Sequence, residues 1–350
     1  MGKSALTDTV TSAFLSLVRS GLWDRPLSEE EYSSLLLLSS EEWEAVWSMA
    51  GRQTVTGLLD AAFELLPQQV TIPPKLDYAA MADADRLTAA HARQKAAVEE
   101  LTAFFGRYGL TPVYLKGLEA AALYSRPELR ELGDIDVYFP EADFEKALAA
   151  IRTHAADTLY HTPDDSVHFS FRGIDVDVHP SYFDLATPAE SLPPVGSPEA
   201  RLFMLNVHIL KHACGIGIGL RQLCDMSRAY ARLDYSEEQY RFYCEKSGIL
   251  RWTRLLSSFL RTYLGADSAP LFGEPALKPG RLFHIVRRGG NFGHHLSGRR
   301  AALERHPFLR KADTFYRFLQ AIPFSLRFAP GQSLSLMKTL FLGQFKSIFR

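Results

Sequence analysis

The chain has 350 residues, of which 47% are hydrophobic and 23% charged, and its formal net charge is −1. This length and composition allow a large buried core, which excludes an intrinsically disordered chain and favours about two domains. The three cysteines, Cys214, Cys224 and Cys244, are too few and too widely spaced for a disulfide framework or a zinc knuckle.

The N-terminal segment lacks the continuous apolar run of a signal peptide. No apolar stretch reaches the roughly 18 residues that a membrane-spanning helix needs. We therefore expect a cytoplasmic protein in a reducing compartment.

Residues 1–108 are predicted to form a helical N-terminal region, because apolar residues recur at intervals of three and four over residues 10–18 and 58–63. Ser28 with Glu31 and Ser39 with Glu42 have the spacing of capping boxes and predict two helix starts. A loop is expected over residues 68–74, followed by a long helix over residues 79–108.

Residues 109–196 have the pattern of a small α/β core. We expect a short strand at residues 112–115, a turn at Lys116-Gly117, a helix over residues 118–124, a strand at residues 134–139 and a helix over residues 141–152. Residues 167–171 and 174–179 are predicted to form a hairpin that turns at Arg172-Gly173.

Residues 197–350 are predicted to form a helical C-terminal domain, with its clearest helices at residues 198–214, 220–233, 236–246 and 252–263. Its last part is a basic tail, since residues 281–350 contain 13 Lys or Arg against only Glu304 and Asp313. Such a tail either packs on an acidic surface of its own chain or contacts a phosphate-rich partner or the surface of a membrane. The expected fold class is therefore α+β, a mixed sheet flanked by two helical regions.

Asp134 and Asp136 lie two residues apart on a predicted strand, so both side chains leave the same face. Asp175 and Asp177 repeat this spacing on a later strand, and pairing of the two strands would gather up to four carboxylates. Such a group repels itself unless cations are bound, and oxygen ligands suit Mg²⁺ or Mn²⁺. The alternative is ordinary polar patterning on the exposed side of a strand.

The neighbouring residues favour a phosphate-binding site. Lys116 and Gly117 stand at a strand-to-helix junction, where glycine lets a phosphate approach the backbone. Arg130 lies four residues before Asp134 and could deliver a planar cation to a triphosphate.

These motifs resemble an uncharacterised nucleotidyltransferase family within the DNA polymerase beta superfamily. The resemblance rests on Lys116-Gly117, Tyr124, Arg130, the segment Gly133-Asp134-Ile135-Asp136, and the pattern Asp177-Val178-His179. It extends to His208, His212, Leu220-Arg221 and Asp225, and covers roughly residues 110–230.

The resemblance implies a minimal polymerase-beta-type domain with a two-metal mechanism. Asp134 and Asp136 would bind the metals, and Asp177 would complete the site and deprotonate the acceptor, although Asp175 on the same face is not excluded. Lys116, Gly117, Arg130 and Gly133 would contact the nucleotide.

His208 and His212 have the spacing that brings two side chains to one face of a helix. Zinc binding, contact with a substrate and a hydrogen-bonded core pair are the three interpretations of this pair.

The expected function is transfer of a nucleoside monophosphate from an NTP, with ATP favoured, to a hydroxyl on a sugar, a small metabolite or a protein side chain. The alternative is a non-catalytic nucleotide sensor or antitoxin-like protein of the same fold. A nucleic-acid acceptor is disfavoured, because basic and aromatic residues are not interleaved in the α/β core. The sequence does not indicate the acceptor, the base or the oligomeric state.

Overall fold

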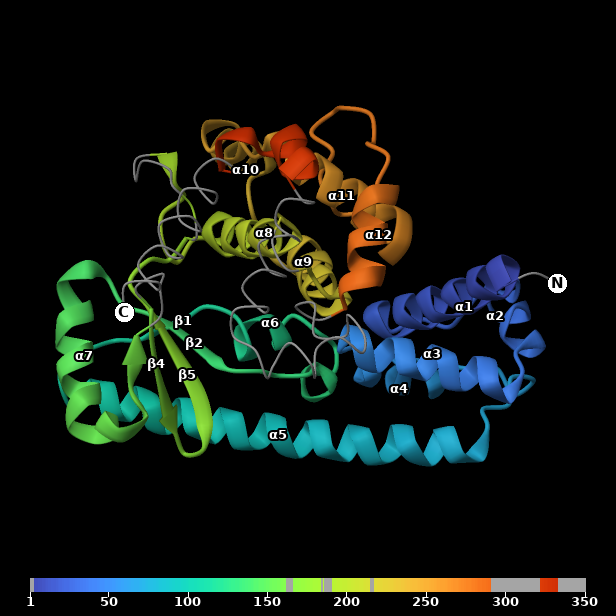
Figure 1. Ribbon diagram of the computed structural model, residues 1–350, viewed down its shortest axis with the longest axis horizontal. Coiled ribbons are helices and arrows are strands. Elements are labelled where there is room, and N and C mark those ends of the chain that lie inside the picture. The colour runs from blue at the N-terminus through green and yellow to red at the C-terminus, as the bar shows by residue number, and fades with distance from the viewer. Residues whose placement is uncertain are drawn as a thin grey trace, which may run out of the picture.

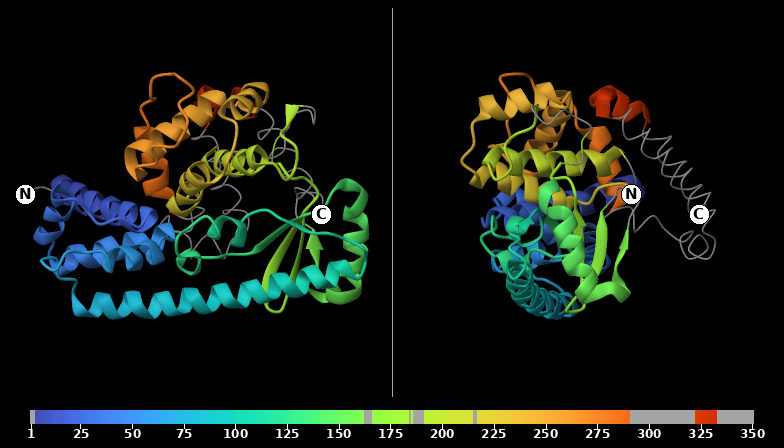
Figure 2. Two further views of the ribbon diagram at one scale, coloured as in Figure 1. Left: turned by 180° about the vertical axis from the view of Figure 1, so that it is seen from behind. Right: turned by 90° about the vertical axis from the view of Figure 1, so that its left-hand side faces the viewer.

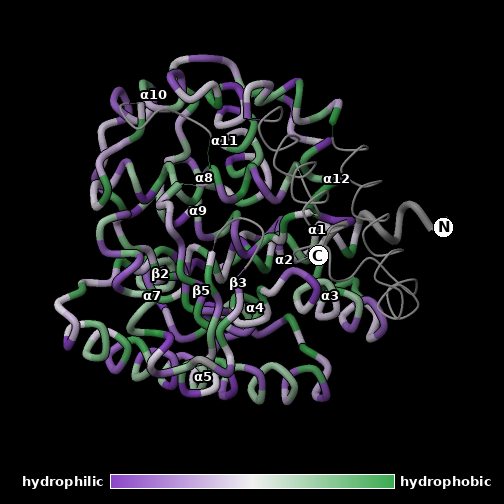
Figure 3. The backbone as a smooth tube through the Cα atoms, turned by 60° about the vertical axis from the view of Figure 1, so that its left-hand side comes forward, coloured by the Kyte–Doolittle hydropathy of each residue, from purple (hydrophilic) through white to green (hydrophobic). Residues whose placement is uncertain are grey.

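The longest element is α5 (Pro74–Gly106), a helix of 33 residues that runs along one side of the molecule in the computed structural model (Figure 1). A helix of this length spans about 50 Å. Its first half packs through Leu76 into the core of the helical regions, and its second half packs through Leu101 and Phe105 against the sheet. Purple and green alternate along α5 in Figure 3, as expected of a helix with one buried face.

The structure describes residues 3–161, 166–183, 185, 191–214, 217–290 and 322–332. Most of the predicted basic tail therefore lies outside the described residues. No helix in the described part of the chain combines the length and apolar character needed to cross a membrane.

The N-terminal region is helical, as predicted. Its elements are α1 (Lys3–Trp23), α2 (Glu29–Ser33), the 3₁₀ turn η1 (Leu35–Leu37), α3 (Ser40–Gln53) and α4 (Thr56–Phe63). Both predicted capping boxes are present. The Ser28 and Ser39 hydroxyls each accept from the backbone amide of the glutamate three residues later, and each serine backbone amide donates to the carboxylate of that glutamate. The long helix begins earlier than expected, since Pro74 occupies its first turn, where a missing amide hydrogen costs nothing.

The sheet has five strands in the order β1-β2-β5-β4-β3, and they are β1 (Val113–Tyr114), β2 (Ile135–Tyr138), β3 (Tyr160–His161), β4 (Val167–Phe171) and β5 (Ile174–His179). The pairing of β2 with β5 is parallel and the others are antiparallel, so the sheet is mixed and the fold is α+β. The predicted hairpin is confirmed: Arg172 and Gly173 have φ of 53° and 73°, and both left-handed residues match a two-residue turn.

The two faces of the sheet differ in chemistry. Val137, Phe169 and Val178 point to one face and share a core with the second half of α5 and with α7 (Glu141–Ala155). Figure 2 shows both helices beside the strands. Because side chains alternate along a strand, the residues between these apolar positions point to the opposite face.

Short turns connect these elements: α6 (Leu118–Ala121), η2 (Pro127–Leu129) and η3 (Ala156–Thr158). The helix expected over residues 118–124 therefore stops after one turn. The strand expected at residues 134–139 covers only Ile135–Tyr138, because the Asp134 carbonyl accepts from the Gln94 side chain instead of a neighbouring strand.

The C-terminal region contains α8 (Pro198–Cys214), α9 (Leu220–Arg232), α10 (Glu237–Lys246), α11 (Leu250–Leu264) and α12 (Gly280–Gly289). Its buried side chains belong to the same apolar core as those of α1, α3 and α4. The first and last described helical regions thus pack on each other, and the sheet lies beside them (Figure 1).

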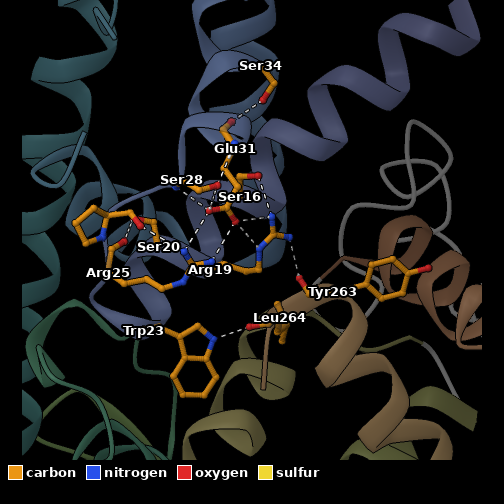
Figure 4. A network of polar contacts seen from close by, with 11 residues as sticks. Ser16, Arg19, Ser20, Trp23, Arg25, Ser28, Glu31, Ser34, Tyr263 and Leu264 are labelled. Carbon is orange, nitrogen blue, oxygen red and sulfur yellow. Dashed lines mark hydrogen bonds and ion pairs between the residues drawn. The ribbon is translucent and has the colours of Figure 1, made fainter. Parts of the chain in front are cut away.

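A polar network fixes this contact between the two helical regions (Figure 4). The Arg19 guanidinium donates to the Glu31 carboxylate and, at 3.5 Å, to the Tyr263 carbonyl in α11. Arg25 donates to both oxygens of Glu31, and the Trp23 indole donates to the Leu264 carbonyl at 2.5 Å. Glu31 is therefore the acceptor on which two arginines of the N-terminal region converge.

We expect Glu31→Gln to destabilise the fold by about 1–2 kcal/mol at pH 7, because it removes the charge but leaves a side chain that can still complete the capping box. Burial opposes ionisation, but Arg25, the Ser28 amide and Arg19 lower the pKa of Glu31 from 4.5 to about 2. The folded pKa lies below the unfolded one, so this stabilisation is present above pH 4.5 and is lost as the pH falls toward 2.

Thermal unfolding between pH 2 and 7 measures this contribution. The control is Glu30→Gln, which removes a charge from an exposed neighbour in the same helix turn. Equal stability of the two variants across this pH range would contradict a special contribution of Glu31.

Candidate active site

A cavity of about 290 Å³, here called the central cavity, opens between the polar face of the sheet and helices α8 and α9. The structure brings every predicted site residue into its lining, namely Lys116, Gly117, Arg130, Gly133, Asp134, Asp136 and Asp177. These residues come from the β1–α6 junction, the segment before β2, and strands β2 and β5.

Two carboxylates face each other across the parallel pair of strands. Asp136 of β2 lies directly opposite Asp177 of β5 in the register, so both side chains leave the same face of the sheet. Asp136 is buried, at 8% exposure, whereas Asp134 lies just before β2 and is exposed. Asp175 is exposed and does not line the cavity.

Cationic groups compensate the charge of Asp136. The Lys116 ammonium and the His179 Nε2 each lie 2.9 Å from Asp136 Oδ1. Burial opposes ionisation of Asp136, but the Lys116 charge and the His179 hydrogen bond outweigh it and hold the pKa of this carboxyl well below its ordinary range. The pKa of His179 is raised, because its interaction with Asp136 outweighs the effect of its burial.

Asp177 lies between two imidazoles. Its Oδ2 is 3.4 Å from His179 Nε2, and its Oδ1 is 3.2 Å from the Nε2 of His168, which is opposite Asp177 in the antiparallel register of β4 and β5. Burial raises the pKa of the Asp177 carboxyl above its ordinary value, although both histidines act in the opposite direction. The ring of Tyr160 stacks on His168, with centroids 5.0 Å apart.

The donor atoms fit a divalent cation. Single ligand atoms from Asp136, Asp177 and His179 lie within 4.8 Å of one another, and this is the one such group among the described residues. Carboxylate oxygens suit Mg²⁺ or Mn²⁺, while an imidazole nitrogen in the ligand set favours Mn²⁺ over Mg²⁺. The Lys116 ammonium lies beside Asp136 and compensates the negative charge that a bound divalent cation would also compensate.

The two histidines of α8 line the central cavity, with ring centroids 4.5 Å apart. His208 Nδ1 lies 3.5 Å from the Lys116 ammonium. Burial and the nearby Lys116 charge hold the pKa of His208 well below its ordinary value, so its neutral ring can accept this hydrogen bond. His208 thus helps to position Lys116 against Asp136.

Arg130 is paired with a carboxylate of the C-terminal region. Its Nε and Nη2 donate to the two oxygens of Asp225 at 3.1 and 2.5 Å, and the Tyr124 hydroxyl donates to the same carboxylate at 2.8 Å. All three residues are buried. Breaking such a pair leaves an uncompensated charge in the interior, so this contact joins the α/β core firmly to α9.

The segment before β2 is held by its backbone carbonyls. Arg130 and Arg221 each donate to the Glu131 carbonyl, and the Gln94 amide of α5 donates to the carbonyls of Gly133 and Asp134. The Nε of Arg221 is buried and has no hydrogen-bond partner among the described residues. Arg221 therefore brings an unused donor to the wall of the cavity.

Several of these contacts were not predicted from the sequence. The alternation of β4 could have placed His168 on the polar face, but its position opposite Asp177 depends on the hairpin register. The role of Gln94 has no local signal, because its partners are about 40 residues away in the chain.

The family model described as an uncharacterised nucleotidyltransferase matches residues 39–265, which is more than half of the chain. The match includes every predicted site residue. No curated protein and no solved structure gives a match.

We expect Mn²⁺ to bind the 350-residue chain through Asp136 and Asp177, and Asp136→Asn to weaken this binding by on the order of 10- to 100-fold or more. The substitution removes a charged ligand but keeps the size of the side chain. Isothermal titration calorimetry with Mn²⁺ measures the affinity, and a melting curve checks that the variant is folded.

Asp175→Asn is the matched control, because Asp175 lies on β5, the strand of Asp177, but outside the cavity. The assignment would be wrong if Asp136→Asn and Asp175→Asn bound Mn²⁺ as tightly as the unchanged protein.

Proposed function

The chain belongs to the uncharacterised nucleotidyltransferase family, and we propose that it transfers a nucleoside monophosphate from an NTP, with ATP favoured, to a hydroxyl acceptor by the two-metal mechanism of the DNA polymerase beta superfamily. The acceptor is a sugar, a small metabolite or a protein side chain. The observation that carries the proposal is that Asp134, Asp136 and Asp177 line one cavity, which Lys116 and Arg221 also line.

Asp134, Asp136 and Asp177 are the proposed metal ligands. Ligand atoms of Asp136, Asp177 and His179 lie within 4.8 Å of one another, whereas Asp134 lines the same cavity outside that group. Divalent metal bound there would neutralise the triphosphate and stabilise the leaving pyrophosphate. Such a metal would compensate the charge of Asp136 in place of Lys116, and the Lys116 ammonium would then be available to a phosphate oxygen.

Arg221 is the second proposed phosphate ligand. Its buried Nε lacks a partner among the described residues, and a planar guanidinium suits phosphate oxygens. Arg130, the arginine predicted for this role, is engaged with Asp225, and we propose that it acts by holding Arg221 and the segment before β2 in place. Gly117 has φ of 57°, which a side chain would strain, so this position keeps a bare backbone at the wall of the cavity.

Asp177 is the proposed general base. It stands on the strand next to Asp136, and a base must reach the acceptor hydroxyl beside the metal-bound phosphate. The proton of the acceptor would move to this carboxylate as the acceptor oxygen attacks the α-phosphorus and pyrophosphate leaves.

A nucleotide sensor is the second candidate function. It is favoured by the ion pair of Lys116 with Asp136, because this contact and His179 compensate the buried carboxylate without any metal. A protein of this kind would bind a nucleotide and release no pyrophosphate.

Asp177→Asn is expected to lower magnesium-dependent pyrophosphate release by on the order of 100- to 10,000-fold, with a much smaller loss of ATP affinity, because it removes a base but keeps most nucleotide contacts. Asp175→Asn should have little effect on either quantity. A coupled pyrophosphate assay with a panel of hydroxyl acceptors, alongside calorimetry with ATP, measures both.

Equal losses in the two variants would contradict Asp177 as the base. Tight ATP binding with no pyrophosphate release from the unchanged protein, whichever acceptor is added, would favour the sensor.

A further inference from the structure

A second cavity, of about 540 Å³, lies where α1, α3 and the end of α12 meet. It is here called the arginine cavity. Figure 1 shows the end of α12 reaching α3, and the Gln53 side chain confirms this contact by donating to the Val286 carbonyl at 3.0 Å. None of the residues on which the proposed nucleotidyl transfer rests lines this second cavity.

Three arginines from two helices line the arginine cavity: Arg52 of α3, and Arg287 and Arg288 of α12. All three are exposed, and none has an ion pair or hydrogen bond of its side chain with a described residue. No Asp or Glu belongs to the described lining. Like charges therefore gather here, and no carboxylate of the described residues balances them.

Helix dipoles do not remove this excess. Each arginine lies in the last turn of its helix, where a cation is normally favourable. A helix C-terminus carries roughly half a negative charge, so two of them offset about one of the three positive charges. About two positive charges are therefore left at the cavity, and the interaction with the helix C-termini does not account for them.

The remaining lining is mixed in character. Val10, Ala45 and Met49 provide an apolar surface, and Ser48 provides a hydroxyl. A ligand that fits must therefore be anionic at one end, and it can bury a small apolar group at the other.

We propose that the arginine cavity is a second ligand site that binds the phosphate groups of a small polyphosphate through Arg52, Arg287 and Arg288. Phosphate is the favoured anion, because three guanidinium groups can donate to several oxygens of two or more phosphates at once. The site does not depend on the proposed nucleotidyl transfer.

Gln53 connects this site to the central cavity. Its Oε1 accepts from the Leu220 amide at 2.8 Å, at the start of α9, while its Nε2 holds the Val286 carbonyl beside the arginines. The next two residues of α9, Arg221 and Gln222, line the central cavity. One buried side chain, that of Gln53, thus links the wall of the arginine cavity to the start of α9.

Inorganic triphosphate, titrated into the full chain in buffer without divalent metal, tests the proposal by calorimetry. We expect a binding event that is weakened by on the order of 10- to 100-fold in the triple variant Arg52→Ala, Arg287→Ala, Arg288→Ala. The matched control is the triple variant Arg93→Ala, Arg152→Ala, Arg232→Ala. It removes the same charge from exposed arginines outside the cavity and should keep this binding event.

Binding that is equally strong in all three proteins would overturn the proposal, as would an equal loss in both triple variants, since that would reflect overall charge. Unchanged Mn²⁺ binding at the central cavity shows that the cavity variant is folded, and this readout is separate from any pyrophosphate release. If the triple variant does not fold, Arg52→Ala alone and the pair Arg287→Ala, Arg288→Ala must each weaken binding for the proposal to stand.

A titration with ATP in place of inorganic triphosphate distinguishes two kinds of ligand that carry the same phosphate groups, a nucleotide and a simple polyphosphate. If ATP binds more tightly than inorganic triphosphate, and this binding is lost in the triple variant of Arg52, Arg287 and Arg288, the apolar wall of the cavity binds the nucleoside. Equal binding of the two probes, also lost in that variant, assigns the site to a polyphosphate alone.

Discussion

The parallel register of β2 and β5 is the constraint on which the central cavity depends. It places Asp136 directly beside Asp177 on the polar face of the sheet, and like charges in neighbouring strands destabilise a sheet unless cations lie close. Lys116 and His179 provide that compensation for Asp136, and the His168 ring lies 3.2 Å from the other side of Asp177. The same pair of carboxylates, costly to bury together, is the one that we propose as the centre of a divalent-metal site.

The helices supply the rest of the wall and keep it in position. The opposite face of the sheet is apolar and packs on α5 and α7, so the polar face must turn toward α8 and α9. The buried contact of Arg130 with Asp225 joins α9 to the segment before β2, and Gln94 holds that segment from α5. A metal site whose ligands are fixed to a few tenths of an ångström requires such supports, because side chains on an unsupported segment lose the geometry of the site.

Local features were predictable from the sequence and distant partners were not. Helix α8 was predicted with its observed bounds, and the hairpin turn at Arg172-Gly173 follows from residues that are adjacent in the chain. Membership in the nucleotidyltransferase family and the α+β fold also agree with the motifs around Asp134 and Asp136. The partner of Arg130 could not be predicted, because Asp225 lies 95 residues away and only packing brings it close.

A crystal structure with Mn²⁺ and a non-hydrolysable ATP analogue tests the central claim most directly. The account predicts anomalous density for Mn²⁺ between Asp134, Asp136 and Asp177, with the triphosphate beside Arg221 and the Lys116 ammonium moved from Asp136 to a phosphate oxygen. Density for the analogue without Mn²⁺, with Lys116 still paired to Asp136, would contradict a metal-dependent nucleotidyltransferase site.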